Sequence, residues 1–195
     1  NKPLLVWSIE SAFKAGIQRI IVSTDNKEYA SIAKEVGAEV LIRPEELSGD
    51  EISMFQVLKS EVYKISPLPE IVVLLSPTSP FRKAVQLKLA ISYFTENLDR
   101  YDSLMSVQKV PNRYNPAQVI VQTPIGKRMA NGSVLSNRIT RRQEYPEAFV
   151  TAGGIYIFKT SNLQEGSFYG KEIMLFELEP DVDINTLEDW EKEEK

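Results

Sequence analysis

Hydrophobic residues follow two spacings in the first half of the chain, and the two alternate. Residues 71–75 are continuously apolar, which is typical of a strand buried on both faces of a sheet. Strands are also predicted at 17–22, 38–42 and 103–107, and helices at 4–13, 29–36, 52–65 and 84–95. Strands that alternate with helices predict an α/β fold, with a largely parallel sheet covered on both faces.

The alternation stops at residues 111–150. Two short apolar runs, 117–122 and 129–135, flank a Pro-Ile-Gly turn signal at 124–126, so they predict two short strands. We therefore expect a single domain, residues 1–195, into which residues 111–150 are inserted as a β-rich arm.

Composition limits the chemistry that the chain can perform. Its 195 residues include no histidine and no cysteine, which excludes Ser-His and Cys-His nucleophiles and the usual zinc sites. The net charge of −4 gives no indication of binding to nucleic acid or to a membrane surface. No apolar run approaches the length of a transmembrane helix and no signal peptide is visible, so we expect a cytoplasmic protein. Catalysis must then depend on carboxylates, Lys, Arg, hydroxyls, backbone amides and oxygen-bound metals.

Three oxygen-bearing side chains follow the last predicted strand. Asp181, Asp183 and Asn185 alternate with apolar residues, so an extended backbone places all three on one side. Such a cluster of oxygen ligands suits Mg²⁺. The alternative is structural, because Asn185 and Glu188 have the spacing of a capping box at the start of the final helix.

Two further groups of residues are candidates for binding anions. The first is in the loop after the strand at 38–42, where Arg43 is followed by Asp50 and Ser53 and is placed to meet a phosphate or a base edge. The second is a basic cluster in the arm: Arg138, Arg141, Arg142 and Gln143. Arginine pairs with carboxylates and phosphates through its two-pronged guanidinium. Solvated surface arginines are the simpler interpretation of both groups.

The polar loop after the strand at 71–75 has the most informative position. Open α/β sheets bind ligands at the carboxyl ends of their strands, and this loop offers hydroxyls and backbone amides there. A plain proline-rich turn is the alternative. The candidate residues are Ser76, Pro77, Thr78, Ser79 and Arg82.

Five stretches of the chain together resemble the acylneuraminate cytidylyltransferases, the CMP-sialic acid synthetases. Residues 76–82, Ser-Pro-Thr-Ser-Pro-Phe-Arg, are similar to the family's Gln-Pro-Thr-Ser-Pro-Leu-Arg loop. The other four occur in the family's order: Val22-Ser-Thr-Asp25, Arg43-Pro-Glu-Glu-Leu-Ser-Gly-Asp50, Arg141-Arg-Gln-Glu-Tyr-Pro146 leading to Gly153-Gly-Ile-Tyr-Ile157, and Asp183-Ile-Asn-Thr-Leu-Glu-Asp-Trp190. The resemblance covers essentially the whole chain.

The resemblance implies a Rossmann-like, three-layer nucleotidyltransferase fold. It implies that CTP is joined to the anomeric hydroxyl of an acidic nine-carbon keto sugar, with release of pyrophosphate and a need for Mg²⁺. It also implies a homodimer in which the arm reaches the partner's site. By the same resemblance, Asp183 and Asn185 are metal and catalytic positions, Arg142 pairs with the sugar carboxylate, and Arg43, Asp50 and Ser53 lie on the nucleotide side. The sugar side comprises Ser76, Pro77, Thr78, Ser79, Arg82, Gln143 and Tyr156.

Several departures from the family pattern affect these expectations. Many members have Gln at the position of Ser76, Asp at that of Asn185 and Asn at that of Ala152. Since that Gln contacts the sugar, its replacement leaves open acceptors other than N-acetylneuraminate itself, although a sialic acid type of sugar is the first expectation. Legionaminic, pseudaminic and deoxyoctulosonic acids are the alternatives. The last is least favoured, because its enzymes carry a Gln-Gly-Asp-Glu-Pro loop instead.

Members of the family open with a strand and a Gly-Ser-Lys phosphate loop, which precede a segment matching the Lys-Pro-Leu at residues 2–4. We expect such a segment upstream of Asn1. Two other functions are consistent with the residues. Asp181-x-Asp183 fits the metal motif of glycosyltransferases, and a chain without the phosphate loop would serve as an inactive, dimeric sugar-binding module.

Overall fold

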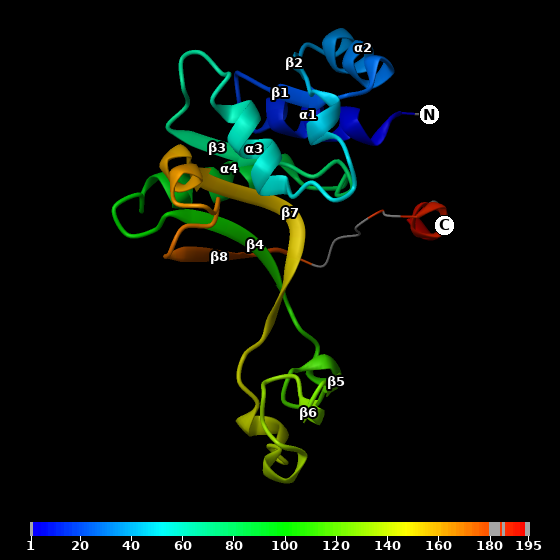
Figure 1. The fold of residues 1–195 in the computed structure, drawn as a ribbon, viewed down its shortest axis with the longest axis vertical. Coiled ribbons are helices and arrows are strands. Elements are labelled where there is room, and N and C mark those ends of the chain that lie inside the picture. The colour runs from blue at the N-terminus through cyan, green and yellow to red at the C-terminus, as the bar shows by residue number, and fades with distance from the viewer. Residues whose placement is uncertain (1, 180–183, 185, 194–195) are drawn as a thin grey trace. The chain divides into compact units, whose positions relative to one another are not determined.

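The computed structural model describes residues 2–179, 184 and 186–193 of the chain. Its helices are α1 (Leu4–Lys14), α2 (Lys27–Glu35), α3 (Met54–Val62), α4 (Ala84–Thr95) and α5 (Leu187–Glu193). Its strands are β1 (Ile21–Thr24), β2 (Glu39–Ile42), β3 (Ile71–Leu74), β4 (Ser103–Lys109), β5 (Ile120–Thr123), β6 (Gly126–Met129), β7 (Phe149–Lys159) and β8 (Ile173–Glu177) (Figure 1). None of the helices in these ranges has the length and apolar character that a membrane crossing requires.

The chain divides into two compact units. The first unit consists of residues Asn1–Ser106 and Ala152–Lys195, and the second unit of residues Val107–Thr151. In the first unit β1 and β2 form a parallel pair, and a separate sheet has the strand order β3-β7-β4-β8. The α/β fold class is confirmed. β7 departs from the parallel pattern, because it runs antiparallel to β3.

Alternation along β7 shows that the first unit has three layers. Ile155 and Ile157 are fully buried in a core cluster with residues of α1 and α4. Phe158, which points to the opposite face of the sheet, is buried against Leu58 and Val62 of α3. Helices therefore cover both faces of this sheet, with α1 and α4 on one side and α3 on the other (Figure 1).

The helices begin at identifiable capping residues. Asn26 caps α2 by accepting from two backbone N–H groups. Ser53 and Gln56 form a complete capping box at the start of α3. At the start of α5, Thr186 and Asp189 exchange capping hydrogen bonds. The predicted pair of Asn185 with Glu188 is not tested, because Asn185 lies outside the described residues.

The second unit contains an antiparallel hairpin of β5 and β6, in which Thr123 pairs with Gly126 across a two-residue turn. The second strand was predicted at 129–135 but lies at Gly126–Met129. It ends early because Asn131 and Gly132 form a turn, with Gly132 at a φ of 88° that favours glycine. Met129 then bonds back to the carbonyl of Ser133 at 2.9 Å.

Candidate active site

The carboxyl ends of β1, β2 and β3 bring several predicted residues to one edge of the first unit. Asp25 and Arg43 directly follow β1 and β2, and Arg43 Nη2 donates to Asp25 Oδ1 at 3.3 Å. The loop at residues 76–82 follows β3, and Ser8 of α1 donates to the carbonyl of Ser76 at 3.3 Å. We call Asp25, Arg43 and residues 76–82 the polar edge.

Hydrogen bonds within the loop at 76–82 fold it into a compact turn. The hydroxyls of Ser76 and Thr78 lie 2.7 Å apart. Arg82 is only 4% exposed, and its Nη2 donates to the carbonyl of Ser76 at 2.8 Å. Ser11 of α1 donates in turn to the carbonyl of Arg82 at 3.0 Å. These contacts hold a guanidinium in the interior beside the carboxyl end of β3.

Ser79 has a buried side-chain hydroxyl without a hydrogen-bond partner in the described part of the chain. It is 2% exposed, and its Oγ has no hydrogen-bond partner within the described residues. A buried hydroxyl without a partner is costly in free energy, so such groups are commonly satisfied by a ligand or by water. Ser79 is therefore the loop hydroxyl for which a ligand or water partner is expected.

The C-terminal segment returns to the same loop. The N–H of Ile184 donates to the carbonyl of Thr78 at 2.7 Å. Lys83 donates to Glu179 at 2.9 Å, and this hydrogen bond lowers the pKa of the Glu179 carboxyl. Two described residues near the Asp-x-Asp-x-Asn pattern, Glu179 and Ile184, thus contact Lys83 and Thr78.

The predicted metal ligands Asp181, Asp183 and Asn185 lie outside the described residues. Within the described ranges, no group of three or more His, Cys, Asp or Glu side chains is close enough to hold a metal ion. The magnesium site therefore stays a prediction.

Three other predicted site residues of the first unit are Ser53, Asp50 and Tyr156. Ser53 Oγ is engaged at the start of α3, where it accepts from the N–H of Gln56 at 3.3 Å. Asp50 is exposed in the loop before that helix. Tyr156 is half-buried opposite Leu74 in the β3–β7 pairing and makes an edge-to-face ring contact with Phe168 at 6.3 Å.

The basic residues of the arm lie in the second unit, Val107–Thr151. Arg142 and Gln143 belong to an exposed 3₁₀ turn, Arg142–Glu144. With the Asn112 amide oxygen turned toward Arg142, it accepts from Nε and Nη2 at 2.9 Å each. Arg141 makes an exposed ion pair with Glu144 at 3.4 Å.

Three residues that sequence reasoning missed help to position Arg82. Ser8 and Ser11 are buried on the otherwise apolar inner face of α1, and a pair of small polar residues three apart on such a face was the available signal. Gly154 of β7 is buried beside the guanidinium. A Cβ at Gly154 would lie 3.8 Å from Arg82 Nε and 3.5 Å from Leu178 Cδ1.

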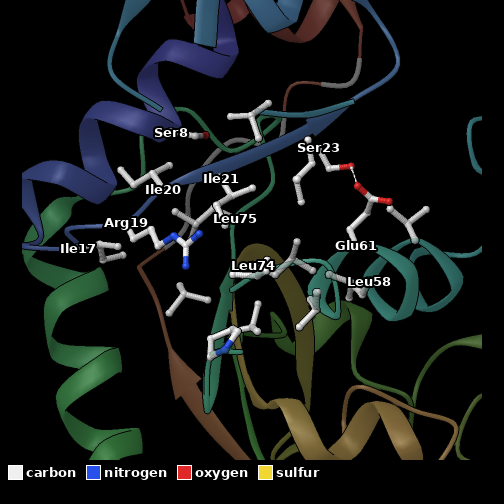
Figure 2. Close-up of a pocket in the computed structure, with 18 of the residues that line it drawn as sticks. Ser8, Ile17, Arg19, Ile20, Ile21, Ser23, Leu58, Glu61, Leu74 and Leu75 are labelled. Carbon is white, nitrogen blue, oxygen red and sulfur yellow. Dashed lines mark hydrogen bonds between the residues drawn. The ribbon is translucent and has the colours of Figure 1, made fainter. Parts of the chain in front are cut away.

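A groove of about 540 Å³ lies between β1 and β3, beneath the polar edge. Figure 2 shows residues of α1, β1, α3 and β3 around it, among them Ser8, Ile21, Leu58 and Leu74. Most of its lining is apolar. Glu61 of α3 is an exception, since its buried carboxylate accepts from Ser23 at 3.4 Å and from Lys64 at 2.6 Å.

Comparison with known proteins identifies the family. A family model described as "Cytidylyltransferase" matches residues 1–192. This chain belongs to the cytidylyltransferase family. The resemblance to acylneuraminate cytidylyltransferases that the five motifs indicated is thereby confirmed at the level of the family.

Sequence relatives within the family agree with this assignment. The chain is 36% identical over 121 residues to an N-acylneuraminate cytidylyltransferase of Escherichia coli, covering 62% of the chain and 28% of that protein. It is 30% identical to the enzyme of the same name from Streptococcus agalactiae, over 97% of the chain and 46% of that protein. The chain therefore spans less than half the length of these two relatives. A CMP-N,N'-diacetyllegionaminic acid synthase of Legionella pneumophila is 26% identical over the full chain and 85% of its own length.

Solved structures support the nucleotidyltransferase fold. A CMP:2-keto-3-deoxy-manno-octonic acid synthetase complexed with CTP matches with a TM-score of 0.71 at 16% identity, over 98% of this chain and 86% of that chain. A putative glucose-1-phosphate thymidylyltransferase from Bacillus anthracis matches with a TM-score of 0.60 at 13% identity, over 97% and 80%. At these identities the likeness establishes the Rossmann-like fold alone.

Proposed function

We propose that the protein containing this chain joins CTP to the anomeric hydroxyl of an acidic nine-carbon keto sugar, and releases a CMP-sugar and pyrophosphate. The observation that carries the proposal is the polar edge, with buried Arg82 and the unpartnered hydroxyl of Ser79, in a chain matched to the cytidylyltransferases over residues 1–192. The family match favours nucleotidyl transfer over the glycosyl transfer that Asp181-x-Asp183 also allows.

The reaction is attack of the anomeric oxygen on the α-phosphorus of CTP, and it requires positioning and charge neutralisation more than covalent work by the protein. On this proposal, Arg43 lies on the nucleotide side, where Asp25 orients its guanidinium. Ser76, Thr78 and Ser79 offer hydroxyls to the sugar, and Arg142 and Gln143 bind its carboxylate. The arm is proposed to contribute those two residues within a homodimer in the cytoplasm.

Asp183 and Asn185 are the proposed ligands of Mg²⁺, and carboxylate and amide oxygens suit that ion. Held by these residues, the ion would supply charge neutralisation at the α-phosphate and would lower the pKa of a bound hydroxyl, a route to deprotonation in a chain without histidine. The hydrogen bond from Ile184 to Thr78 supports this assignment, because it fastens the residue between the two ligands to the sugar-side loop. Chelation with EDTA should therefore abolish turnover.

The identity of the sugar is proposed to depend on Ser76. Its short hydroxyl is committed to Thr78 at 2.7 Å, so it reaches less far than the Gln of many family members. An acceptor with different substituents from N-acetylneuraminate, of the legionaminic or pseudaminic type, fits this difference. The legionaminic acid synthase among the relatives is consistent with it.

The test is a pyrophosphate-release assay on the full-length protein with Mg²⁺, CTP, and in parallel UTP, GTP and ATP. Each nucleotide is combined with N-acetylneuraminic, legionaminic, pseudaminic and deoxyoctulosonic acids. We expect release with CTP and at least one nine-carbon acid. Release of nucleoside diphosphate from UDP- or GDP-sugars without CTP turnover would instead indicate a glycosyltransferase, and binding of sugar without turnover an inactive module.

A further inference from the structure

The loop at residues 76–82 is attached to helix α1 at both of its ends. Ser8 Oγ donates to the carbonyl of Ser76 at 3.3 Å, and Ser11 Oγ donates to the carbonyl of Arg82 at 3.0 Å. Residues three apart on a helix are neighbours on the same face. A single face of α1 therefore holds the first and the last residue of the loop.

Helix α1 is a rigid support for these two contacts. Ile9 and Ala12, which follow the two serines in sequence, are each 2% exposed and belong to two different core clusters. Ser8 and Ser11 are themselves buried. A buried hydroxyl costs free energy unless it makes a hydrogen bond. On α1 the two hydroxyls are buried where the loop supplies their acceptors.

The contact from Ser8 is not needed to satisfy the carbonyl of Ser76. That carbonyl also accepts from Arg82 Nη2 at 2.8 Å and from the N–H of Ser79 at 3.4 Å. A carbonyl oxygen has two lone pairs, so these two donors already match its usual capacity. What the third donor supplies is a connection between the loop and α1.

The carbonyl of Ser76 is also the start of the turn that carries the loop's hydroxyls. The N–H of Ser79 closes a four-residue turn with Pro77 at its second position, which suits the fixed φ of proline. The hydroxyls of Ser76 and Thr78 lie 2.7 Å apart within it. The N–H of Ile184 donates to the carbonyl of Thr78 at 2.7 Å. A displacement of the Ser76 carbonyl would therefore move the hydroxyls of the turn together.

We propose that Ser8 and Ser11 are positioning residues for the sugar site, because they hold both ends of the loop on α1 and so set where its hydroxyls meet the acidic sugar. This role rests on the proposed function, in which the loop faces the sugar. The two serines act through the loop and do not touch a substrate. Their loss should weaken sugar binding and leave the nucleotide side unchanged, since Arg43 is oriented by Asp25 instead.

The test compares Ser11→Ala and Ser8→Ala with Ser103→Ala in the full-length protein. Ser103 is a matched control, because it is buried in the first unit and its hydroxyl also donates to a backbone carbonyl, that of Tyr169. Ser11→Ala and Ser103→Ala should lose similar stability in urea. The KM for the sugar should rise about fivefold in Ser11→Ala and about twofold in Ser8→Ala, whose hydrogen bond is longer, with the KM for CTP unchanged. Ser103→Ala should keep both constants.

Amide hydrogen exchange gives a second measurement, which needs no turnover. The N–H groups of Ser79 and Ile184 bond to carbonyls of the turn, so their exchange should be faster by about fivefold or more in Ser11→Ala and not in Ser103→Ala. If the unaltered protein consumes no CTP with any acidic sugar, the proposed function fails. The exchange rates alone then decide whether the two serines position the loop.

Equal sugar KM values in Ser11→Ala and Ser103→Ala would overturn the proposal, as would a KM for CTP that rises as much as the KM for the sugar. Unchanged exchange at Ser79 and Ile184 would overturn it as well. If Ser8→Ala and Ser11→Ala both fail to fold while Ser103→Ala folds, the two hydroxyls serve the stability of the first unit instead, and the proposal is wrong.

Discussion

Two loops of this protein carry arginines assigned to the same acidic sugar, and their surroundings differ sharply. In the first unit Arg82 is 4% exposed and is joined to Ser76, while its own carbonyl accepts from Ser11. In the second unit Arg142 is exposed on a three-residue 3₁₀ turn beside Asn112. The first arginine is part of the framework of its loop, whereas the second is available to a ligand. The comparison predicts that stability depends on Arg82 and that recognition of the sugar carboxylate depends on Arg142.

The largest effect is expected from Arg82→Ala. Removal of the guanidinium leaves a cavity and deprives the part-buried carbonyl of Ser76 of the closer of its two side-chain donors, so the free energy of unfolding should fall by about 3 kcal/mol. Urea unfolding followed by circular dichroism measures this change. Arg141→Ala, at an exposed ion pair, is the matched control and should change stability by less than about 0.5 kcal/mol. Equal urea unfolding midpoints for the two variants would show that Arg82 does not stabilise the fold.

A smaller effect of a different kind is expected from Arg142→Ala. The KM for the acidic sugar should rise about tenfold, which corresponds to about 1.4 kcal/mol, with the KM for CTP and the unfolding midpoint unchanged. Steady-state kinetics with each substrate varied in turn gives both constants. Arg138→Ala serves as the control for loss of one positive charge in the arm. An unchanged sugar KM in Arg142→Ala would show that the exposed arginine does not bind the carboxylate.

Substitutions of Ser53 distinguish its structural role as a helix cap from its proposed contact with the nucleotide. Ser53→Ala should lower the free energy of unfolding by about 1 kcal/mol, because α3 loses its N-cap. Ser53→Asn keeps a capping side chain and should retain the stability of the parent protein. If Ser53 also contacts the nucleotide, the KM for CTP will rise in both variants. A KM for CTP that stays constant in Ser53→Asn would restrict this residue to capping.

The smallest effect is expected from Ser79→Ala. Its hydroxyl is buried and has no partner within the described residues, so its removal should change stability by less than about 0.5 kcal/mol. The same change should raise the KM for the sugar about threefold, as expected for loss of one neutral hydrogen bond. Loss of stability without a change in the KM for the sugar would indicate that Ser79, like Arg82, stabilises the loop and does not bind the sugar.

The sequence predicted the polar edge because an apolar run that ends in a polar loop marks the carboxyl end of a strand. Asp25 and Arg43, which form an ion pair, and Ser76 each lie at or just after the carboxyl end of a strand for that reason. The burial of Arg82 was not predictable in this way, because it depends on Ser8 and Ser11, which are distant in the chain and come close only through the packing of α1.

Local patterns are ambiguous where two positions satisfy the same rule. At the start of α5, Asn185 with Glu188 and Thr186 with Asp189 have the same capping spacing, and spacing alone does not distinguish them; among the described residues, Thr186 and Asp189 exchange the capping hydrogen bonds. The antiparallel direction of β7 was missed for another reason. It follows from the return of the chain after the inserted segment, and apolar spacing within a strand carries no information about direction.

The central claim is cytidylyl transfer to an acidic keto sugar, and product formation tests it most directly. The full-length protein is incubated with CTP, Mg²⁺ and each nine-carbon acid, and the products are identified by mass spectrometry. The account predicts a CMP-sugar and pyrophosphate in equal amounts, which disappear when the sugar is omitted. Unconsumed CTP with every acidic sugar, from protein whose unfolding curve is intact, would contradict it.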